Sequence, residues 1–326
     1  MLKFRNLGLI ATPRNLDLRD GRAGFMQSPQ TLQFDGFIRI YFSTRFLDSS
    51  SKPISQVEYL DFSNDWHCLD SFSKPLSIGK SVLGAYDEHG IFPFVPFRIS
   101  EKVILGYISG WSRRVSVDVE TAIGICITHN NGETFTRIGN GPILAAGIGE
   151  PFLVGDPFVI ANGDQMIMYY IFGTSWISDP QNPTAPLDRV YRIGLATSTD
   201  AINWDRRNGN QIISFEDELE CQALPSVTRF QDSWLMAFCY RNAHDFRHNK
   251  EKGYRLGFAR SLDGFNWSRL SEKDCTMELG DWNSEMQCYP NLYASGDQIY
   301  LISNGNQFGK HGFGLHVLEG EIKNGI

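Results

Sequence analysis

The chain has 326 residues, of which 42% are hydrophobic, 13% aromatic and 21% charged. Such a composition supplies a large core and excludes a chain that is disordered throughout. The 30 basic and 37 acidic residues give a formal net charge of −7, which excludes the basic surfaces that bind nucleic acids or anionic membranes. At about 150 residues per domain, the length alone would suggest two domains.

The first residues contain no targeting signal. Residues 7–10 form a short apolar run, but Gly8 interrupts it and Pro13 follows soon after, so it is too short for a signal-peptide core or a membrane span. We therefore expect a cytoplasmic protein without membrane insertion. The six cysteines are scattered and contain no CxxC pair, which predicts buried reduced thiols and neither a metal site nor a cofactor.

A repeat of about 65 residues recurs along the chain. Each copy begins with a proline that leads into an apolar run, and the separations between these prolines are 64, 64, 68 and 65 residues. A second run with Tyr or Phe near its centre follows each proline. Short apolar runs rich in β-branched and aromatic residues predict strands. The leading prolines are Pro29, Pro93, Pro157, Pro225 and Pro290.

The middle three copies contain a third run that ends in a turn and an aromatic residue. Asn131-Gly132 and Asp263-Gly264 supply the positive φ that a tight hairpin needs. We expect the aromatic residues Phe135, Trp204 and Trp267 to open a fourth strand and to pack between neighbouring sheets.

Four strands in each of five copies predict an all-β fold, and specifically a five-bladed β-propeller with four antiparallel strands per blade around a central funnel. The repeat replaces the two-domain estimate with a single domain over residues 1–326. An alternative, two stacked β-sandwiches, fits the even spacing less well. The N-terminal segment can complete the last blade. The expected blades cover approximately residues 20–75, 85–140, 150–210, 220–275 and 285–326.

Acidic residues precede most of the leading prolines. The first strand of each propeller blade lines the central axis, so we expect the residues just before it to gather at one mouth of the funnel. Carboxylates that share one site push their pKa values apart, as acid/base catalysis requires. The alternative for any single acid is a turn cap or an ion pair with an arginine between blades. The expected catalytic residues are Glu220 and Glu285, modulated by Asp87, Glu88 and Asp156.

Aromatic and polar residues near the ends of the second strands form a further set. Aromatic faces stack on sugar rings, while Arg, Asn and Gln bind hydroxyl groups. Packing between blades is the favoured alternative for Trp204 and Trp267, and is evenly balanced for the tryptophans in this set. The expected substrate-binding residues are His89, Arg45, Trp111, Glu150, Trp176, Gln222, Tyr240, Arg241, Gln287, Asn304 and Asn306.

With these elements placed, the chain resembles the five-bladed propeller glycosidases, a superfamily that includes glycoside hydrolase family 43, the invertase-like enzymes of family 32 and the mannoside phosphorylases of family 130. It is most similar to a glycosylase-like group found in bacterial surface-polysaccharide gene clusters. The likeness covers nearly the whole chain. The stretches that carry it are residues 89–93, 108–111, 141–144, 150–151, 191–196, 240–241, 253–257, 281–286 and 304–306.

The resemblance implies an enzyme that cleaves or transfers a glycosyl group in surface-polysaccharide metabolism, with a small sugar, glycan or activated sugar as its partner. The hydrolase families use a base from blade one, a helper Asp from blade two and a general acid Glu from a later blade. This chain has Ser28 where the blade-one Asp is expected, so either the acids of blades two to five take over its role or the reaction differs from that of family 43. Two alternatives stay open: a non-catalytic sugar-binding propeller, and a phosphorylase that holds inorganic phosphate with Arg45, Arg241 and His244. Neither the sequence nor the resemblance sets the oligomeric state.

Overall fold

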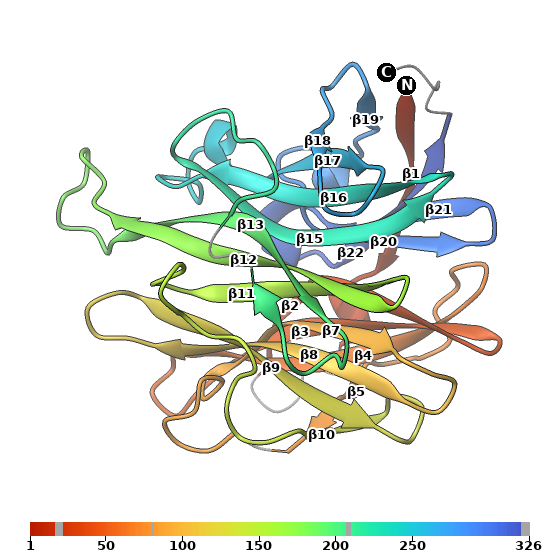
Figure 1. Ribbon diagram of the computed structural model, residues 1–326, viewed down its shortest axis with the longest axis horizontal. Coiled ribbons are helices and arrows are strands. Elements are labelled where there is room, and N and C mark those ends of the chain that lie inside the picture. Colours follow the sequence, from red (N-terminus) through yellow and green to blue (C-terminus); the bar gives the residue numbers. More distant parts are fainter. Residues whose placement is uncertain (17–21, 80, 207–209, 321–326) are drawn as a thin grey trace.

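A computed structural model of the chain describes residues 1–16, 22–79, 81–206 and 210–320. Within these ranges, all regular structure consists of β-strands and four 3-10 turns, and the prediction of an all-β chain is confirmed. Figure 1 shows the strands as successive layers, with the N-terminal sheets at the bottom and the C-terminal sheets at the top. The expected blade limits at residues 20 and 326 lie outside the described residues. No helix in the described ranges has the length and apolar character needed to cross a membrane.

The first two groups of strands form one nine-stranded sheet, because β4 pairs in parallel with β7 through Ser55 and Gly90. A Cβ atom at Gly90 would lie 2.1 Å from the carbonyl oxygen of Ser55, so only glycine allows this approach. We call the two groups sheet 1 and sheet 2. Sheet 1 contains β2 (Arg22–Phe34), β3 (Phe37–Leu47), β4 (Pro53–Ser63) and β5 (Lys74–Pro75). Sheet 2 contains β7 (Gly90–Arg98), β8 (Ile104–Arg113), β9 (Val119–Thr128), β10 (Thr134–Arg137) and β6 (Ser77–Ile78).

The remaining strands form three separate sheets. Sheets 3 and 4 are antiparallel meanders of four strands each, and sheet 5 has five strands. Sheet 3 contains β11 (Val154–Asn162), β12 (Gln165–Ile177), β13 (Asp188–Ser198) and β14 (Asp205–Arg206). Sheet 4 contains β15 (Glu220–Phe230), β16 (Ser233–Asn242), β17 (Arg255–Ser261) and β18 (Ser268–Arg269). Sheet 5 contains β20 (Cys288–Ser295), β21 (Gln298–Asn304), β22 (Phe313–Glu319), β1 (Leu2–Ala11) and β19 (Cys275–Met277).

The N-terminal strand belongs to the last sheet. β1 pairs antiparallel with β22, from Lys3 opposite Glu319 to Ala11 opposite Phe313, and its outer edge pairs in parallel with β19. Backbone donors and acceptors along β1 are therefore satisfied on both sides over part of its length, as buried strands require.

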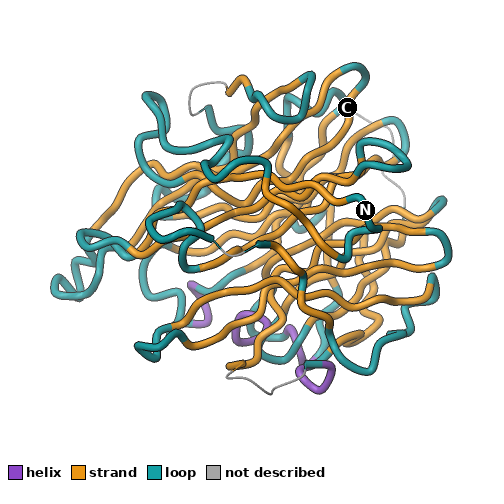
Figure 2. The backbone as a smooth tube through the Cα atoms, turned by 90° about the horizontal axis from the view of Figure 1, so that it is seen from below, coloured by secondary structure: helices purple, strands orange, loops and turns teal. Residues whose placement is uncertain are grey.

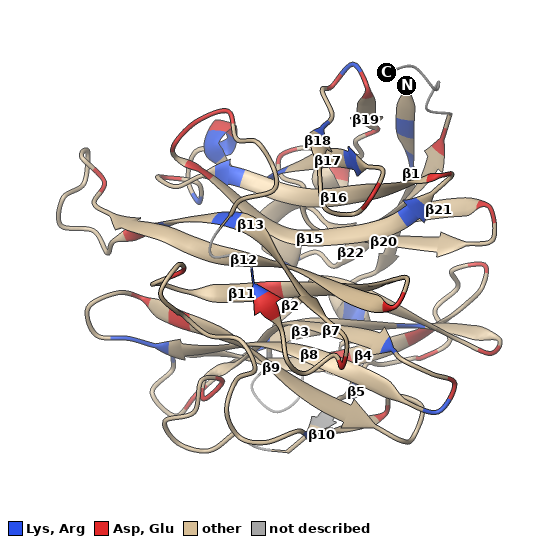
Figure 3. Ribbon diagram, viewed as in Figure 1, with Lys and Arg blue, Asp and Glu red and all other residues tan. Residues whose placement is uncertain are grey.

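The first strands of the five sheets contact one another in pairs: β2 with β7, β7 with β11, β11 with β15, β15 with β20, and β20 with β2. The hydrophobic core follows the same order. One cluster of buried side chains lies at each junction between consecutive sheets, including the junction between sheet 5 and sheet 1. Burial of apolar area at these junctions is the main force that holds the sheets together. Charged side chains are concentrated in the loops and near strand ends, as Figure 3 shows.

A tyrosine on the second strand of three sheets bonds to the aromatic turn of the next sheet. Each hydroxyl donates to the carbonyl of the residue with positive φ: Tyr41 to Gly132 at 2.9 Å, Tyr107 to Ala201 at 3.0 Å and Tyr169 to Gly264 at 2.8 Å. The same tyrosine rings lie 6.2, 5.9 and 5.6 Å, centroid to centroid, from the aromatic residues of those turns, Phe135, Trp204 and Trp267. The prediction that these aromatic residues pack between neighbouring sheets is confirmed.

Each leading proline sits at a β-bulge. The register of the first strand against the second shifts at all five prolines. The residue before the proline has a positive φ in four sheets: 54° at Ser28, 50° at Asp156, 48° at Leu224 and 56° at Tyr289. In sheet 2 the corresponding Phe92-Pro93 bond is cis. The positive φ re-aims a side chain out of the ladder, which is the common use of bulges beside functional sites.

The short turns mark one face of the molecule. Figure 2 shows the four 3-10 turns gathered on one side of the strands. Two of them, η1 (Pro13–Asn15) and η3 (Asp281–Asn283), precede the first strands of sheets 1 and 5; the others, η2 (Lys250–Lys252) and η4 (Asn306–Gly309), follow the second strands of sheets 4 and 5. The beginnings of first strands and the ends of second strands therefore meet on this face, which we call the turn face.

Candidate functional site

Asp156 is the one carboxylate among the five residues that directly precede the leading prolines. Its side chain reaches from sheet 3 to sheet 4, where its Oδ2 accepts a hydrogen bond from the backbone N–H of Leu224 at 3.3 Å. Only 9% of the residue is exposed, and burial raises the pKa of Asp156 from 3.8 to about 7, although the Leu224 N–H and the Arg189 charge oppose this shift. A carboxyl group that is half protonated near neutral pH suits acid/base chemistry.

Aromatic rings from sheets 2, 4 and 5 form a cluster that Cys239 connects to Asp156, because the Asp156 carboxyl group and the Tyr289 backbone both act on the Cys239 thiol. The Phe92 ring lies 5.2 Å from Tyr289, and Tyr289 lies 5.7 Å from Tyr254. Phe308, on η4, lies 6.1 Å from Tyr254 and 6.2 Å from Phe246. Phe92 and Tyr289 both directly precede leading prolines, so the bulges of two sheets that do not adjoin bring these rings into contact.

Four arginines accompany the rings. Arg45 donates to Gln27 Oε1 at 2.8 Å and lies 5.4 Å from the Phe92 ring. The buried Arg241 donates to the hydroxyls of Tyr191 at 3.1 Å and Tyr254 at 3.3 Å. Its guanidinium also stacks 3.6 Å from the Phe246 ring, and that of Arg247 lies 4.7 Å from the same ring. Arg189, close to Asp156, is the fourth.

Three of the expected acidic residues instead form ion pairs within their own sheets. Each acid lies at or just before the start of the first strand and meets an arginine on the fourth strand: Asp87 with Arg137 at 2.6 Å, Glu150 with Arg206 at 2.8 Å, and Glu220 with Arg269 at 2.8 Å. The carboxylates are at most 6% exposed and the arginines at most 25%. These acids therefore form ion pairs with arginines, as the alternative interpretation of single acids predicts. Each arginine, however, belongs to the same sheet as its acid and not to a neighbouring one.

The other two expected acids lie at the surface. Glu88 is exposed and accepts a hydrogen bond from the backbone of Gly84 at 3.2 Å. Glu285 has a 49% exposed side chain that pairs with Lys250. Of the five expected catalytic residues, the structure therefore brings Asp156 to the aromatic and arginine cluster and places the other four elsewhere.

The expected binding residues of sheet 2 form a small surface group. The Trp111 indole N–H donates to the Ser55 hydroxyl at 2.7 Å, and the His89 ring lies 5.6 Å from Trp111. Burial and the neighbouring Arg113 lower the pKa of His89. The group thus lies at the junction of sheets 1 and 2.

The remaining expected binding residues serve mainly local structure, apart from Arg45 and Arg241. Gln222 donates to Glu220 at 2.9 Å, and Tyr240 lies under Arg269, with 4.6 Å between guanidinium and ring, so both accompany the Glu220 ion pair. Trp176 packs against the core between sheets 3 and 4. Three amides bond to backbone: Gln287 to the Asn283 carbonyl, Asn304 to the Met26 and Gly312 carbonyls, and Asn306 to the Glu285 and Met286 N–H groups.

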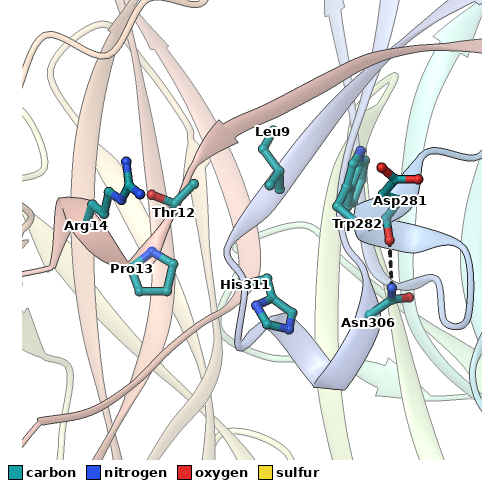
Figure 4. Close-up of a pocket in the computed structure, with 8 residues that line it drawn as sticks. All are labelled: Leu9, Thr12, Pro13, Arg14, Asp281, Trp282, Asn306 and His311. Carbon is teal, nitrogen blue, oxygen red and sulfur yellow. Dashed lines mark hydrogen bonds between the residues drawn. The ribbon is translucent and has the colours of Figure 1, made fainter.

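A cleft of about 520 Å³ opens on the turn face between η1, which follows β1, and the turns η3 and η4 of sheet 5. Figure 4 shows Thr12, Pro13 and Arg14 on one side, Trp282, Asp281 and Asn306 on the other, and His311 between them. Its lining is mostly apolar and includes none of the residues around Asp156. Among the described residues, no three His, Cys, Asp or Glu side chains gather as a metal site would require.

Sequence reasoning missed several residues of the cluster: Phe92, Tyr289, Tyr254, Phe308, Phe246, Arg189 and Arg247. Phe92 and Tyr289 could have been identified because each stands directly before a leading proline. The bulge lies at the proline itself, and not five residues earlier, where the acids were sought. The arginine two residues after Phe135, Trp204 and Trp267 would have identified the ion pairs. No pattern in the chain indicates Phe308 or Tyr254.

The raised pKa of Asp156 predicts a pH-dependent stability difference. Between about pH 4 and 7 the folded chain keeps a proton that the unfolded chain has lost, so wild-type stability falls as the pH rises through this window. Asp156→Asn does not titrate there, and its stability relative to wild type should rise by up to about 4 kcal/mol from pH 4 to pH 8, at about 1.36 kcal/mol per unit. Urea unfolding of both proteins at the two pH values measures this. A difference that is constant with pH would contradict the assigned pKa.

No protein-family model matches the chain. The uncharacterized protein Rv1502 of Mycobacterium tuberculosis (strain ATCC 25618 / H37Rv) is 28% identical over 320 residues, which cover 98% of this chain and 100% of that protein. The uncharacterized protein MT1551 of strain CDC 1551 / Oshkosh matches with the same identity and coverage.

Solved structures share the fold over almost the whole chain. A glycoside hydrolase superposes with a TM-score of 0.72 at 13% identity, covering 97% of this chain and 92% of that one. A thermostable family-43 glycoside hydrolase gives 0.63 at 12% identity, covering 95% and 94%. A structure from the family 130 of mannoside phosphorylases, which contains hydrolases of β-1,2 mannosidic linkages in Candida mannan, gives 0.64 at 12% identity, covering 96% and 93%. The chain therefore has the fold of these propeller glycosidases.

Proposed function

We propose that this protein is a carbohydrate-active enzyme that cleaves or transfers a glycosyl group on the turn face of a closed five-bladed propeller. The cycle of contacts among the five first strands, and the core cluster at each junction, support the closed ring. The fold shared with glycoside hydrolases and a phosphorylase family supports the class of reaction by analogy.

The observation that carries the proposal is the environment of Asp156. A carboxyl group with a pKa of about 7 lies at a bulge, close to Arg189, and Cys239 connects it to the aromatic cluster. In this role the Asp156 carboxylic acid donates its proton to the glycosidic oxygen as the bond between that oxygen and the anomeric carbon breaks. Water or an acceptor hydroxyl forms the new bond to the anomeric carbon and releases its proton to solvent. The rings of Phe92 and Tyr289 offer faces for the C–H surface of a sugar.

A screen for product tests the proposal. Purified protein is incubated with reducing-end-labelled oligosaccharides, neutral and acidic, and with nucleotide sugars, with and without inorganic phosphate, and products are identified by mass spectrometry. We expect shortened or extended glycans from at least one substrate class. Glycans that bind by calorimetry and give no product would instead identify a sugar-binding protein and overturn the enzymatic proposal.

A further inference from the structure

Arg45 is held rigidly with its charge unpaired. Its Nε donates to Gln27 Oε1 at 2.8 Å, and Gln27 in turn donates through Nε2 to the Phe308 carbonyl at 2.7 Å. The guanidinium lies 5.4 Å from the Phe92 ring, and the residue is only partly exposed. Among the described residues, no carboxylate lies within ion-pair distance of Arg45.

Arg247 approaches the same place from the loop after β16. Its guanidinium lies 4.7 Å from the Phe246 ring and 5.6 Å from the Phe308 ring. The Phe246 ring is held in place, because it also stacks on the guanidinium of the buried Arg241 at 3.6 Å. Cation–π contacts of this kind orient a guanidinium without neutralising it. No carboxylate of the described chain pairs with Arg247 either.

The two guanidinium groups act on one another. Burial lowers the pKa of Arg45, and the positive charge of Arg247 lowers it further, while both arginines also act on Tyr289. Two cations brought together in a partly desolvated site cost free energy unless an anion joins them. The arginines on the fourth strands of sheets 2, 3 and 4 differ from Arg45 and Arg247 in this respect. Each of them has a buried carboxylate at 2.6–2.8 Å; they are Arg137, Arg206 and Arg269.

An anionic group of a bound ligand can therefore neutralise the charges of Arg45 and Arg247. Guanidinium groups bind carboxylate and phosphate through paired, charge-assisted hydrogen bonds. An anion between Arg45 and Arg247 would lie beside Phe92 and Tyr289, whose rings contact the adjoining sugar.

We propose, resting on the function proposed above, that the substrate is an acidic glycan whose carboxylate or phosphate ester lies between Arg45 and Arg247. The anionic group is part of the substrate and is not consumed; it places the sugar ring on the Phe92 and Tyr289 rings. Uronic acids and phosphorylated sugars share this chemistry, and the ligands used in the test separate them.

The test compares paired ligands. Isothermal titration measures binding of hexuronate oligosaccharides and their carboxyl-reduced neutral counterparts, and of sugar phosphates and the free sugars. For at least one of these pairs, the wild-type protein should bind the acidic ligand at least tenfold more tightly than its neutral counterpart. The affinity for the acidic ligand should fall as the salt concentration rises. Arg45→Gln and Arg247→Gln should each lower that affinity about tenfold, and leave binding of the neutral partner within twofold.

Arg229→Gln is the matched control. Arg229 also stacks on an aromatic ring, Trp234 at 4.0 Å, but at the end of β15 away from the cluster, and its replacement should change neither affinity. Equal binding of acidic and neutral partners, no binding of any acidic ligand, or turnover of a neutral glycan that needs free inorganic phosphate would each overturn the inference. Acidic binding that the two variants weaken, without any product, would support the anion site while overturning the proposed enzymatic function.

Discussion

Replacement of Asp156 by Asn should lower turnover of the best substrate by about 10² to 10⁴-fold, the usual contribution of a general acid. Asn keeps the size and the acceptor oxygen that the Leu224 N–H binds, so the folded structure and ground-state binding should change little, and only the pH dependence of stability should differ as predicted above. Because the pKa of Asp156 is about 7, wild-type kcat/KM should fall above pH 7 as the carboxyl group loses its proton. Steady-state rates from pH 5 to 9 measure both effects.

Glu285→Gln provides the control for this experiment. Glu285 is half exposed and pairs with Lys250, so its replacement should leave the rate and its pH profile almost unchanged. Full activity of Asp156→Asn, or a rate fall above pH 7 that persists in that variant, would place the acid chemistry on another residue.

Replacement of Arg269 by Met should destabilise the protein by about 3–5 kcal/mol, because it leaves the buried Glu220 carboxylate without its partner. Glu220 is 6% exposed, and its Oε1 lies 2.8 Å from Arg269 Nη1. The same carboxylate accepts from Gln222 at 2.9 Å and from the Glu216 N–H at 3.3 Å. Loss of the charge on Arg269 would therefore disturb the start of β15. Chemical denaturation at pH 7 measures the change.

A double variant separates the ion pair from general damage. Combining Arg269→Met with Glu220→Gln removes the unpaired charge, and should recover at least half of the lost stability. Lys250→Met breaks the exposed pair with Glu285 and should cost no more than about 1 kcal/mol. If Arg269→Met costs as little as Lys250→Met, the Glu220 ion pair is not a structural element of sheet 4.

The repeat of about 65 residues could be recognised in the sequence because successive sheets share the same short-range sequence features. Apolar runs and the aromatic turn depend on nearest neighbours in the chain, and they appear at the expected places; the leading prolines lie inside the first strands, at bulges, and not ahead of them as expected. The packing of Trp204 and Trp267 between neighbouring sheets followed from their position in the repeat, and the structure shows that their partners are Tyr107 and Tyr169.

The site was only partly predictable, because the role of a carboxylate depends on partners far along the chain. Asp87 and Glu220 were expected at the same site as Asp156, yet Arg137 and Arg269 pair with them from about fifty residues away. The direction of each side chain also depends on the bulge at the leading proline, where a positive φ re-aims Asp156. Residue type does not reveal that geometry.

The sequence by itself determined an all-β chain of repeated strands, an acidic overall charge and the aromatic residues between sheets, since these depend on composition and short-range periodicity. Only the tertiary structure decided which charges are neutralised and which are left for a ligand. In the folded chain Asp156 is buried and Glu220 forms an ion pair with Arg269. Arg45 and Arg247 lie near one another, and neither forms an ion pair with a carboxylate of the described chain. The reason is physical: burial and pairing are properties of the assembled sheets, and they set the free energy of each charge.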